Sequence, residues 1–182
     1  RPGAGLIAAT SALEFGCGLS TVCDKFSDFS KIKIPMDLMY SSEIPNNVSA
    51  ILLGSGFGRN QQNMDMAWDF IKQFSCNDKC SFVFDADIFY YQKLPLLLEE
   101  LKNQQVILTP HPKELFYLLK LYDIKVDSVE EVIQNRFEFC KLFSEKNPNC
   151  VLVSKGAITY ICHQNQIFIC DVGSVALAKA GS

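Results

Sequence analysis

The chain has 182 residues, a formal net charge of −3 and 48% hydrophobic residues. That length and apolar content suffice for one folded domain with its own core. The charge is small and no basic stripe runs along the sequence, which argues against a nucleic-acid-binding surface. No apolar run is long enough to predict a membrane span, and the chain does not open with a basic-then-apolar signal sequence.

Eight cysteines are spread along the chain without a CxxC pair. Cys76 and Cys80 have no histidine near them in the sequence that would complete a zinc site. Free cysteines in cytosolic proteins are mostly reduced and buried. We therefore expect reduced thiols in a cytoplasmic protein, and the sequence assigns no metal site.

The first predicted element is a helix of small residues that begins near Pro2, because proline suits a first helical position. Gly16 and Gly18 end this helix, and residues 19–23 predict a strand. A parallel α/β unit normally has a strand before such a helix, so we expect residues to be missing upstream. Residues 38–40 predict a further short strand.

An apolar strand at residues 48–53 leads into GSGFGRN at residues 54–60. A short apolar run bounded by turn residues suits a strand buried on both faces. Glycines let the backbone approach a ligand closely, and ligands in open α/β sheets bind beyond the carboxyl ends of strands. The glycines lack the spacing of the dinucleotide-binding fingerprint, and no Walker lysine follows them. The stretch is either a ligand-contacting turn or a tight strand-to-helix turn.

Helices and buried strands then alternate up to a late hairpin. We predict helices at residues 61–74, 94–102, 112–121 and 129–144, and strands at 81–85, 106–108, 150–154, 158–162 and 166–170. The last two strands flank a His-Gln-Asn turn, and residues 171–182 predict a turn followed by the start of a helix. This alternation implies a mostly parallel sheet covered on both faces.

Four strand ends carry groups that are capable of chemistry. They are residues 54–58, Asp85 with Asp87, Thr109–Glu114 and Lys155–Thr159. In a parallel sheet these ends share one edge, so segments far apart in the sequence can converge there. That convergence is stronger evidence for a site than any one motif. Arg59, directly after the glycines, could contact a phosphate or only solvate the start of a helix.

The same groups also have ordinary structural interpretations. Asp85 and Asp87 could hold a metal or a ribose hydroxyl, or could cap a helix. His111 lies between two prolines and could face a ligand or be a surface or structural histidine. Lys155 and Gly156 could bring a cation and bare backbone against phosphates, or could form a plain exit from a strand.

The chain contains, in this order, GAGLIAATSALEFGCGLSTV, ILLGSGFGRN, VFDAD, LTPHPKE, LVSKGAIT and DVGSVALAKAGS. These segments resemble the ADP- or ATP-dependent NAD(P)H-hydrate dehydratases, which are ribokinase-like proteins. The resemblance covers nearly the whole chain, and GSGFGR followed by TPHPKE at this separation is fairly specific. It implies the α/β class, as a three-layer α/β/α ribokinase-like sandwich with a mostly parallel sheet and a late β-hairpin. Residues 1–182 would form a single domain.

The resemblance implies an enzyme that repairs NADH or NADPH hydrated on the nicotinamide ring. A nucleotide phosphorylates the added hydroxyl, and the phosphate then leaves to restore the dihydronicotinamide. Phosphate leaves far more readily than hydroxide, so the enzyme mainly positions the reactants and stabilises charge. ADP or ATP and Mg²⁺ are the implied cofactors. The resemblance also implies a homo-oligomer and allows a fused N-terminal epimerase domain.

The resemblance also assigns site residues. The pocket for the hydrated dinucleotide would be lined by Ala4, Gly56, Gly58 and His111. The adenine nucleotide would be held by Lys155, Gly156, Ala157, Ile158 and Thr159, with Gly181 beginning an anion-binding turn at a helix N-terminus. The family's general base is an Asp two residues after Ser182, so no catalytic residue is assigned. We expect the chain to be cut at both ends. Lys179, where the family usually has a small or hydroxyl residue, could supply a further phosphate contact.

Two other classes of protein stay open from the sequence. Another ribokinase-like small-molecule kinase, such as a vitamin-precursor kinase, would use the same anion-binding turn with a different substrate pocket. A non-catalytic nucleotide-binding module would share the fold without the base. TPHPKE favours the dehydratase, whereas the glycine spacing and a missing downstream acidic residue disfavour a Rossmann dehydrogenase.

Overall fold

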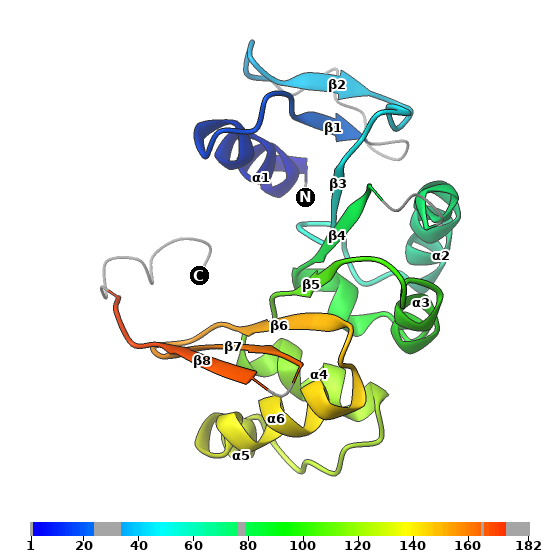
Figure 1. Cartoon of the computed structure of the whole chain (residues 1–182). Helices are drawn as coiled ribbons and strands as arrows, with labels where there is room; N and C mark the ends of the chain where they lie inside the picture. The colour runs from blue at the N-terminus through cyan, green and yellow to red at the C-terminus, as the bar shows by residue number, and fades with distance from the viewer. Residues whose placement is uncertain (1, 24–33, 76–78, 165, 174–182) are drawn as a thin grey trace.

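The computed structural model of the chain describes residues 2–23, 34–75, 79–164 and 166–173 (Figure 1). Its helices are α1 (Pro2–Glu14), α2 (Gln61–Ile71), α3 (Leu94–Glu100), α4 (Pro112–Leu121), α5 (Val129–Gln134) and α6 (Arg136–Lys146), with 3-10 segments η2 (Lys72–Phe74) and η3 (Ala86–Tyr90). Its strands are β1 (Thr21–Cys23), β2 (Met39–Ser41), β3 (Ala50–Leu53), β4 (Ser81–Phe84), β5 (Val106–Leu108), β6 (Cys150–Ser154), β7 (Thr159–His163) and β8 (Gln166–Cys170). Among these residues, every helix is too short or too polar to cross a membrane.

A six-stranded sheet forms the centre of the fold, in the spatial order β3-β4-β5-β6-β7-β8. The strands from β3 to β6 pair in parallel, whereas β7 pairs antiparallel with both β6 and β8. The predicted α/β class, with a mostly parallel sheet and a late hairpin, is confirmed. The strands β1 and β2 form a separate parallel pair, and α1 lies beside them (Figure 1).

One face of the six-stranded sheet packs under helices. Phe82 and Phe84 of β4, Leu108 of β5 and Leu152 of β6 are fully buried on this face. The same core takes in apolar side chains from each of the helices α2 to α6. Alternate strand residues point to opposite faces. The opposite face carries apolar residues that are half-buried: Val83, Ile107, Val151, Val153 and Ile161.

Side-chain caps set where the helices begin. Asn60 Oδ1 accepts a hydrogen bond of 3.1 Å from the Asn63 N–H at the start of α2. Ser128 Oγ accepts one of 3.1 Å from the Glu131 N–H at the start of α5, as the sequence predicts. These bonds satisfy donors that have no partner within the first helical turn.

The helix predicted at residues 129–144 is two helices. Asn135, with φ −114° and ψ 27°, leaves the helical conformation between α5 and α6. Asparagine is a weak helix former because its side chain competes for nearby backbone groups. The break makes Arg136 the first residue of α6.

The other predicted helices and strands occur with small shifts at their ends. The strand expected to be buried on both faces is β3, which instead stands at one end of the described sheet with Leu52 exposed. The helix start predicted within residues 171–182 falls after Gly173, outside the described residues.

Candidate functional site

The carboxyl ends of three neighbouring strands meet at one charged network. Asp85 follows β4, Thr109 follows β5 and Lys155 follows β6. Lys155 Nζ lies 2.6 Å from Asp85 Oδ1, and Thr109 Oγ1 donates to the same oxygen at 2.7 Å. Ser55 Oγ donates to the other oxygen of Asp85 at 3.4 Å. The predicted convergence of strand ends is therefore confirmed for these groups, from parts of the chain that are far apart in sequence.

Asp85 is held in its ionised form by this network. Burial raises the pKa of its carboxyl, but the hydrogen bonds from Lys155 and Thr109, the charge of Lys155 and a backbone hydrogen bond from Ala86 together lower the pKa below its usual value. The sequence had not predicted this role: the Asp85 carboxylate anchors the side chain of Lys155.

The glycine loop begins at a point where only glycine fits. Gly54 has a φ of 116°, and a Cβ there would lie 1.8 Å from the carbonyl oxygen of Asp85. The close approach of β3 to the end of β4 therefore excludes any side chain at this position. Gly54 has a structural role, which the sequence had left open.

Asp87 holds the far end of the same loop. Its Oδ2 accepts a hydrogen bond of 2.8 Å from the Gly58 N–H. Its Oδ1 lies 3.6 Å from Nε of Arg59, whose guanidinium stacks 3.7 Å above the centre of the Tyr90 ring. Gly56, with a φ of 70°, lies between the two fixed ends.

His111 caps helix α4. Its Nδ1 accepts hydrogen bonds from the N–H groups of Lys113 at 3.1 Å and Glu114 at 3.3 Å. Glu114 Oε2 accepts the His111 N–H at 2.8 Å, and Glu114 Oε1 lies 3.0 Å from Nε2 of His111. Histidine is not among the preferred capping residues, so the sequence did not identify this role. The Glu three residues later, as in a capping box, is the signal that could have found it.

The electrostatics of this cap favour a neutral histidine. Burial and then the charge of Lys155 lower the pKa of His111. Glu114 is buried, and burial raises its pKa more than the hydrogen bond from the His111 backbone lowers it. Glu114 Oε2 also lies 4.0 Å from Lys155 Nζ, so the cap and the Asp85 network form one cluster.

The connection between β6 and β7 carries the predicted nucleotide-binding residues. Gly156, Ala157 and Ile158 are exposed. Thr159 is the first residue of β7, so this strand begins one residue later than the sequence predicted. Arg136 of α6 donates hydrogen bonds to backbone carbonyls of this connection. Sequence reasoning missed Arg136, because nothing in its local pattern indicates a contact with β6.

Of the remaining predicted residues, one lies elsewhere in the described fold and two lie outside the described residues. Ala4 lies half-buried in α1, beside β1 and β2 (Figure 1), and the described contacts do not connect it with the Asp85 network. Gly181 and Lys179 lie outside the described residues. The predicted anion-binding turn therefore stays a prediction.

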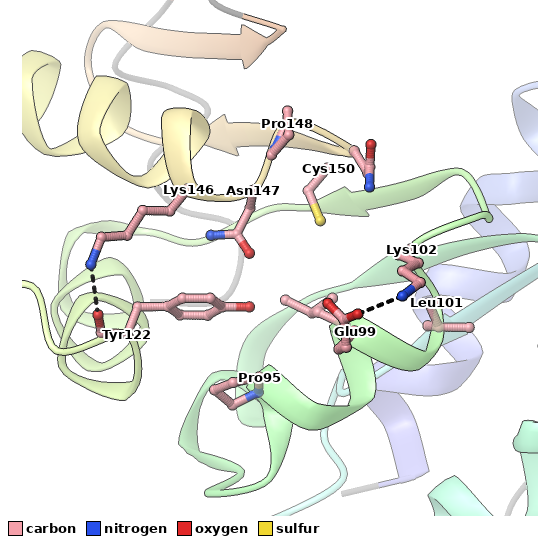
Figure 2. A pocket seen from close by; sticks show the side chains of 11 residues that line it. Pro95, Glu99, Leu101, Lys102, Tyr122, Lys146, Asn147, Pro148 and Cys150 are labelled. Atoms are coloured by element: carbon pink, nitrogen blue, oxygen red, sulfur yellow. Dashed lines mark hydrogen bonds and ion pairs between the residues drawn. The ribbon is translucent and has the colours of Figure 1, made fainter.

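A pocket of about 180 Å³ lies at the amino-terminal end of β6, whereas the charged network lies at the carboxyl ends of the strands. Figure 2 shows the pocket between the ends of α3, α4 and α6 and the start of β6, with Lys146 Nζ donating to the carbonyl oxygen of Tyr122 at 3.2 Å. Burial raises the pKa of the Cys150 thiol in its wall to about 11, which keeps this thiol protonated. Its described lining includes none of the predicted site residues.

Solved structures similar to this chain share its fold. They are Bacillus subtilis YxkO of the UPF0031 family (TM-score 0.71, 23% identity), the Streptococcus mutans protein SMU.573 (0.71, 22%) and a ribokinase-like superfamily protein from Enterococcus faecalis (0.69, 18%). The matches cover 98–99% of this chain and 62–65% of those chains. The predicted ribokinase-like fold is confirmed.

Sequence comparison identifies the family. The bifunctional NAD(P)H-hydrate repair enzyme Nnr of Helicobacter pylori is 42% identical over 180 residues, which are 99% of this chain and 36% of the relative. The chain thus spans about a third of that relative's length. The family profile described as NAD(P)H-hydrate dehydratase matches residues 1–182. The chain belongs to the NAD(P)H-hydrate dehydratase family.

Proposed function

We propose that this chain takes part in the nucleotide-dependent dehydration of hydrated NADH or NADPH, by phosphorylation of the ring hydroxyl and elimination of phosphate. The observation that carries the proposal is the meeting of Lys155, the exposed turn after it and the glycine loop at one sheet edge. A cation beside an exposed turn suits phosphate groups, and this edge is where α/β sheets bind ligands. The H. pylori relative is named as an NAD(P)H-hydrate repair enzyme, which supports the reaction.

The site divides into two sides. On the nucleotide side, Lys155 would meet phosphate, and the Gly156–Thr159 backbone with Gly181 would complete the binding surface. On the substrate side, Gly56, Gly58 and His111 would line the dinucleotide pocket together with Ala4. The glycine loop is fixed at both ends by Gly54 and Asp87. Because it is ordered before substrate binds, binding would cost less conformational entropy.

The donor would be ADP or ATP with Mg²⁺. The charged network fits the nucleotide, because Lys155 is 43% exposed and can reach a phosphate while Asp85 holds it. The carboxylates nearest to this edge are already paired, Asp85 with Lys155 and Asp87 with Gly58 and Arg59. Mg²⁺ keeps most of its waters and binds nucleotides through their phosphates, so it would be held by the nucleotide.

The setting of the whole protein is also a proposal. The described cysteines are free thiols, which supports a cytoplasmic location. The relative is named bifunctional, which supports a fused epimerase domain in the full-length polypeptide. A homo-oligomer is proposed from the family resemblance alone.

The experiment that tests the function supplies hydrated NADH with ADP or ATP to the full-length polypeptide. Recovery of dihydronicotinamide is followed by its near-ultraviolet absorbance. Lys155→Ala should lower kcat/KM by about tenfold or more, the equivalent of one charged hydrogen bond. Lys72→Ala, which removes an exposed lysine on η2, serves as the matched control. Absence of recovery by the unmodified protein with either nucleotide would overturn the proposal.

A further inference from the structure

One side chain, from helix α6, bonds to the turn between β6 and β7. Arg136, the first residue of α6, donates from Nη1 to the carbonyl oxygen of Lys155 at 2.9 Å and from Nη2 to that of Ile158. One planar guanidinium therefore joins both ends of the exposed segment. A rigid fork of donors loses less conformational entropy per bond than a lysine would.

The absence of a side chain at Gly156 leaves room for this guanidinium. A Cβ at Gly156 would lie 1.7 Å from Nη1 and 2.7 Å from Cζ of Arg136. The Tyr160 ring lies 4.9 Å from Cζ, and Phe137 packs edge-on against Tyr160 at 5.8 Å between ring centres. The guanidinium therefore lies between the turn and the Tyr160 ring, and moving it aside would break its bonds to the two carbonyl oxygens.

The same arrangement carries a cost in stability. Nε of Arg136 is buried without a hydrogen-bond partner among the described residues. A buried donor without a partner is unfavourable, and such a group calls for an explanation beyond packing. The shape that Arg136 imposes on the turn supplies that explanation.

We propose that Arg136 is a positioning residue that holds the Lys155–Ile158 turn in the conformation that binds the adenine nucleotide. The inference rests on the proposed function, in which this turn contacts the nucleotide. With two carbonyl oxygens fixed, the exposed turn is ordered before the nucleotide arrives, and binding then costs less entropy. Arg136 acts through the turn and does not itself contact the reacting atoms.

The test compares five variants of the full-length polypeptide: Arg136→Ala, Arg136→Lys, Gly156→Ala, the double variant Arg136→Ala/Gly156→Ala, and Lys141→Ala. The last removes an exposed cation from the same helix and is the matched control. Nucleotide KM, hydrate KM and kcat are measured, with ADP affinity from calorimetric titration and the urea midpoint of unfolding.

We expect Arg136→Ala to raise nucleotide KM about tenfold, from the loss of charged hydrogen bonds. Hydrate KM should change much less, and Arg136→Lys should recover part of the loss. Gly156→Ala should also raise nucleotide KM, by overlap with the guanidinium. The double variant should be no worse than Arg136→Ala alone, because the overlap is gone. Coupled residues deviate from additivity in this way.

An unchanged nucleotide KM in Arg136→Ala would overturn the inference. Rises of similar size in nucleotide KM and hydrate KM, together with a lower unfolding midpoint, would also overturn it, since they indicate a general structural role. If the unmodified protein shows no dehydratase activity, the proposed function fails, and the titration still decides: weaker ADP binding in Arg136→Ala, with Lys141→Ala unchanged, supports Arg136, and equal binding refutes it.

Discussion

Lys155 has two carboxylates near it but is bonded to one. Its Nζ lies 2.6 Å from Asp85 Oδ1 and 4.0 Å from Glu114 Oε2, and only the first distance allows a hydrogen bond. Glu114 Oε2 instead accepts a hydrogen bond from the His111 backbone N–H. Asp85 therefore sets where the ammonium group points, and Glu114 adds only a more distant negative charge.

We predict that Asp85→Asn separates activity from stability. The amide keeps an acceptor for Thr109 but loses the charge that holds Lys155, so kcat/KM should fall by about tenfold. Because Lys155 is 43% exposed, the free energy of unfolding should change by less than about 1 kcal/mol. Asp69→Asn, which breaks the exposed pair with Lys72, is the control. Equal kcat/KM values in both variants would contradict the role of Asp85.

The cap at His111 predicts a pH dependence of stability. The folded pKa of His111 is lowered, so the unfolded chain takes up the proton first as the pH falls. Stability from this group is therefore complete above its unfolded pKa of about 6.5 and is lost as the pH falls toward the lowered folded value. Protonation of Nδ1 would also remove the acceptor for the Lys113 and Glu114 N–H groups.

His111→Asn tests this dependence. Asparagine caps helices well and does not titrate, so the variant should lose less stability than the unmodified chain between about pH 7.5 and about pH 5.5. Urea unfolding at the two pH values gives the comparison. The raised pKa of Glu114 acts in the opposite direction, and Glu114 is present in both chains. The same pH dependence in both would show that His111 does not titrate in this way.

At the residue scale, sequence reasoning identified the chemistry-bearing groups and missed their partners. Lys155, Asp85 and Thr109 were recognised because each ends an apolar strand. Their mutual contacts, and the bonds from Arg136, join residues from different strands and helices. The first contacts depend on the side-by-side order of β4, β5 and β6, and the bonds from Arg136 depend on how α6 packs against the sheet. No local sequence pattern records which side chains bond.

At the scale of elements, the junction between β3 and η3 leaves no room for a side chain. We predict that Gly54→Ala lowers the free energy of unfolding by at least about 2 kcal/mol, from a strained φ and overlap with the Asp85 carbonyl. Gly3→Ala is the control, since a Cβ there meets nothing within 4 Å and α1 favours alanine. Urea unfolding measures both, and a Gly54→Ala chain as stable as Gly3→Ala would contradict the close approach.

The division between α5 and α6 shows why helix ends are harder to predict than helices. The capping pattern at Ser128 correctly marked the start, but Asn135 carries too weak a local signal to mark a break. The break makes Arg136 the first residue of α6, and from this position it donates to the carbonyl oxygen of Lys155 in the turn after β6.

At the scale of the whole molecule, the described fold has two sheets of unequal strength. The strands β1 and β2 form a pair with three residues each, whereas β4 and β5 lie inside the six-stranded sheet. Two-stranded sheets are only marginally stable alone. We predict that backbone amides in β1 and β2 exchange with solvent at least about tenfold faster than those of β4 and β5. Mass spectrometry of deuterium uptake tests this, and equal protection would show that the pair unfolds together with the main sheet.

The order of the strands in the six-stranded sheet has a consequence for the synthesis of the protein. From β3 to β8, each strand lies next to the one that precedes it in the chain. A growing polypeptide can therefore add each new strand to an existing edge as it leaves the ribosome, and none has to insert between two earlier strands. The residues that hold the two ends of the glycine loop, Asp85 and Asp87, follow β4 directly. They are therefore translated before the residues of the β6–β7 turn.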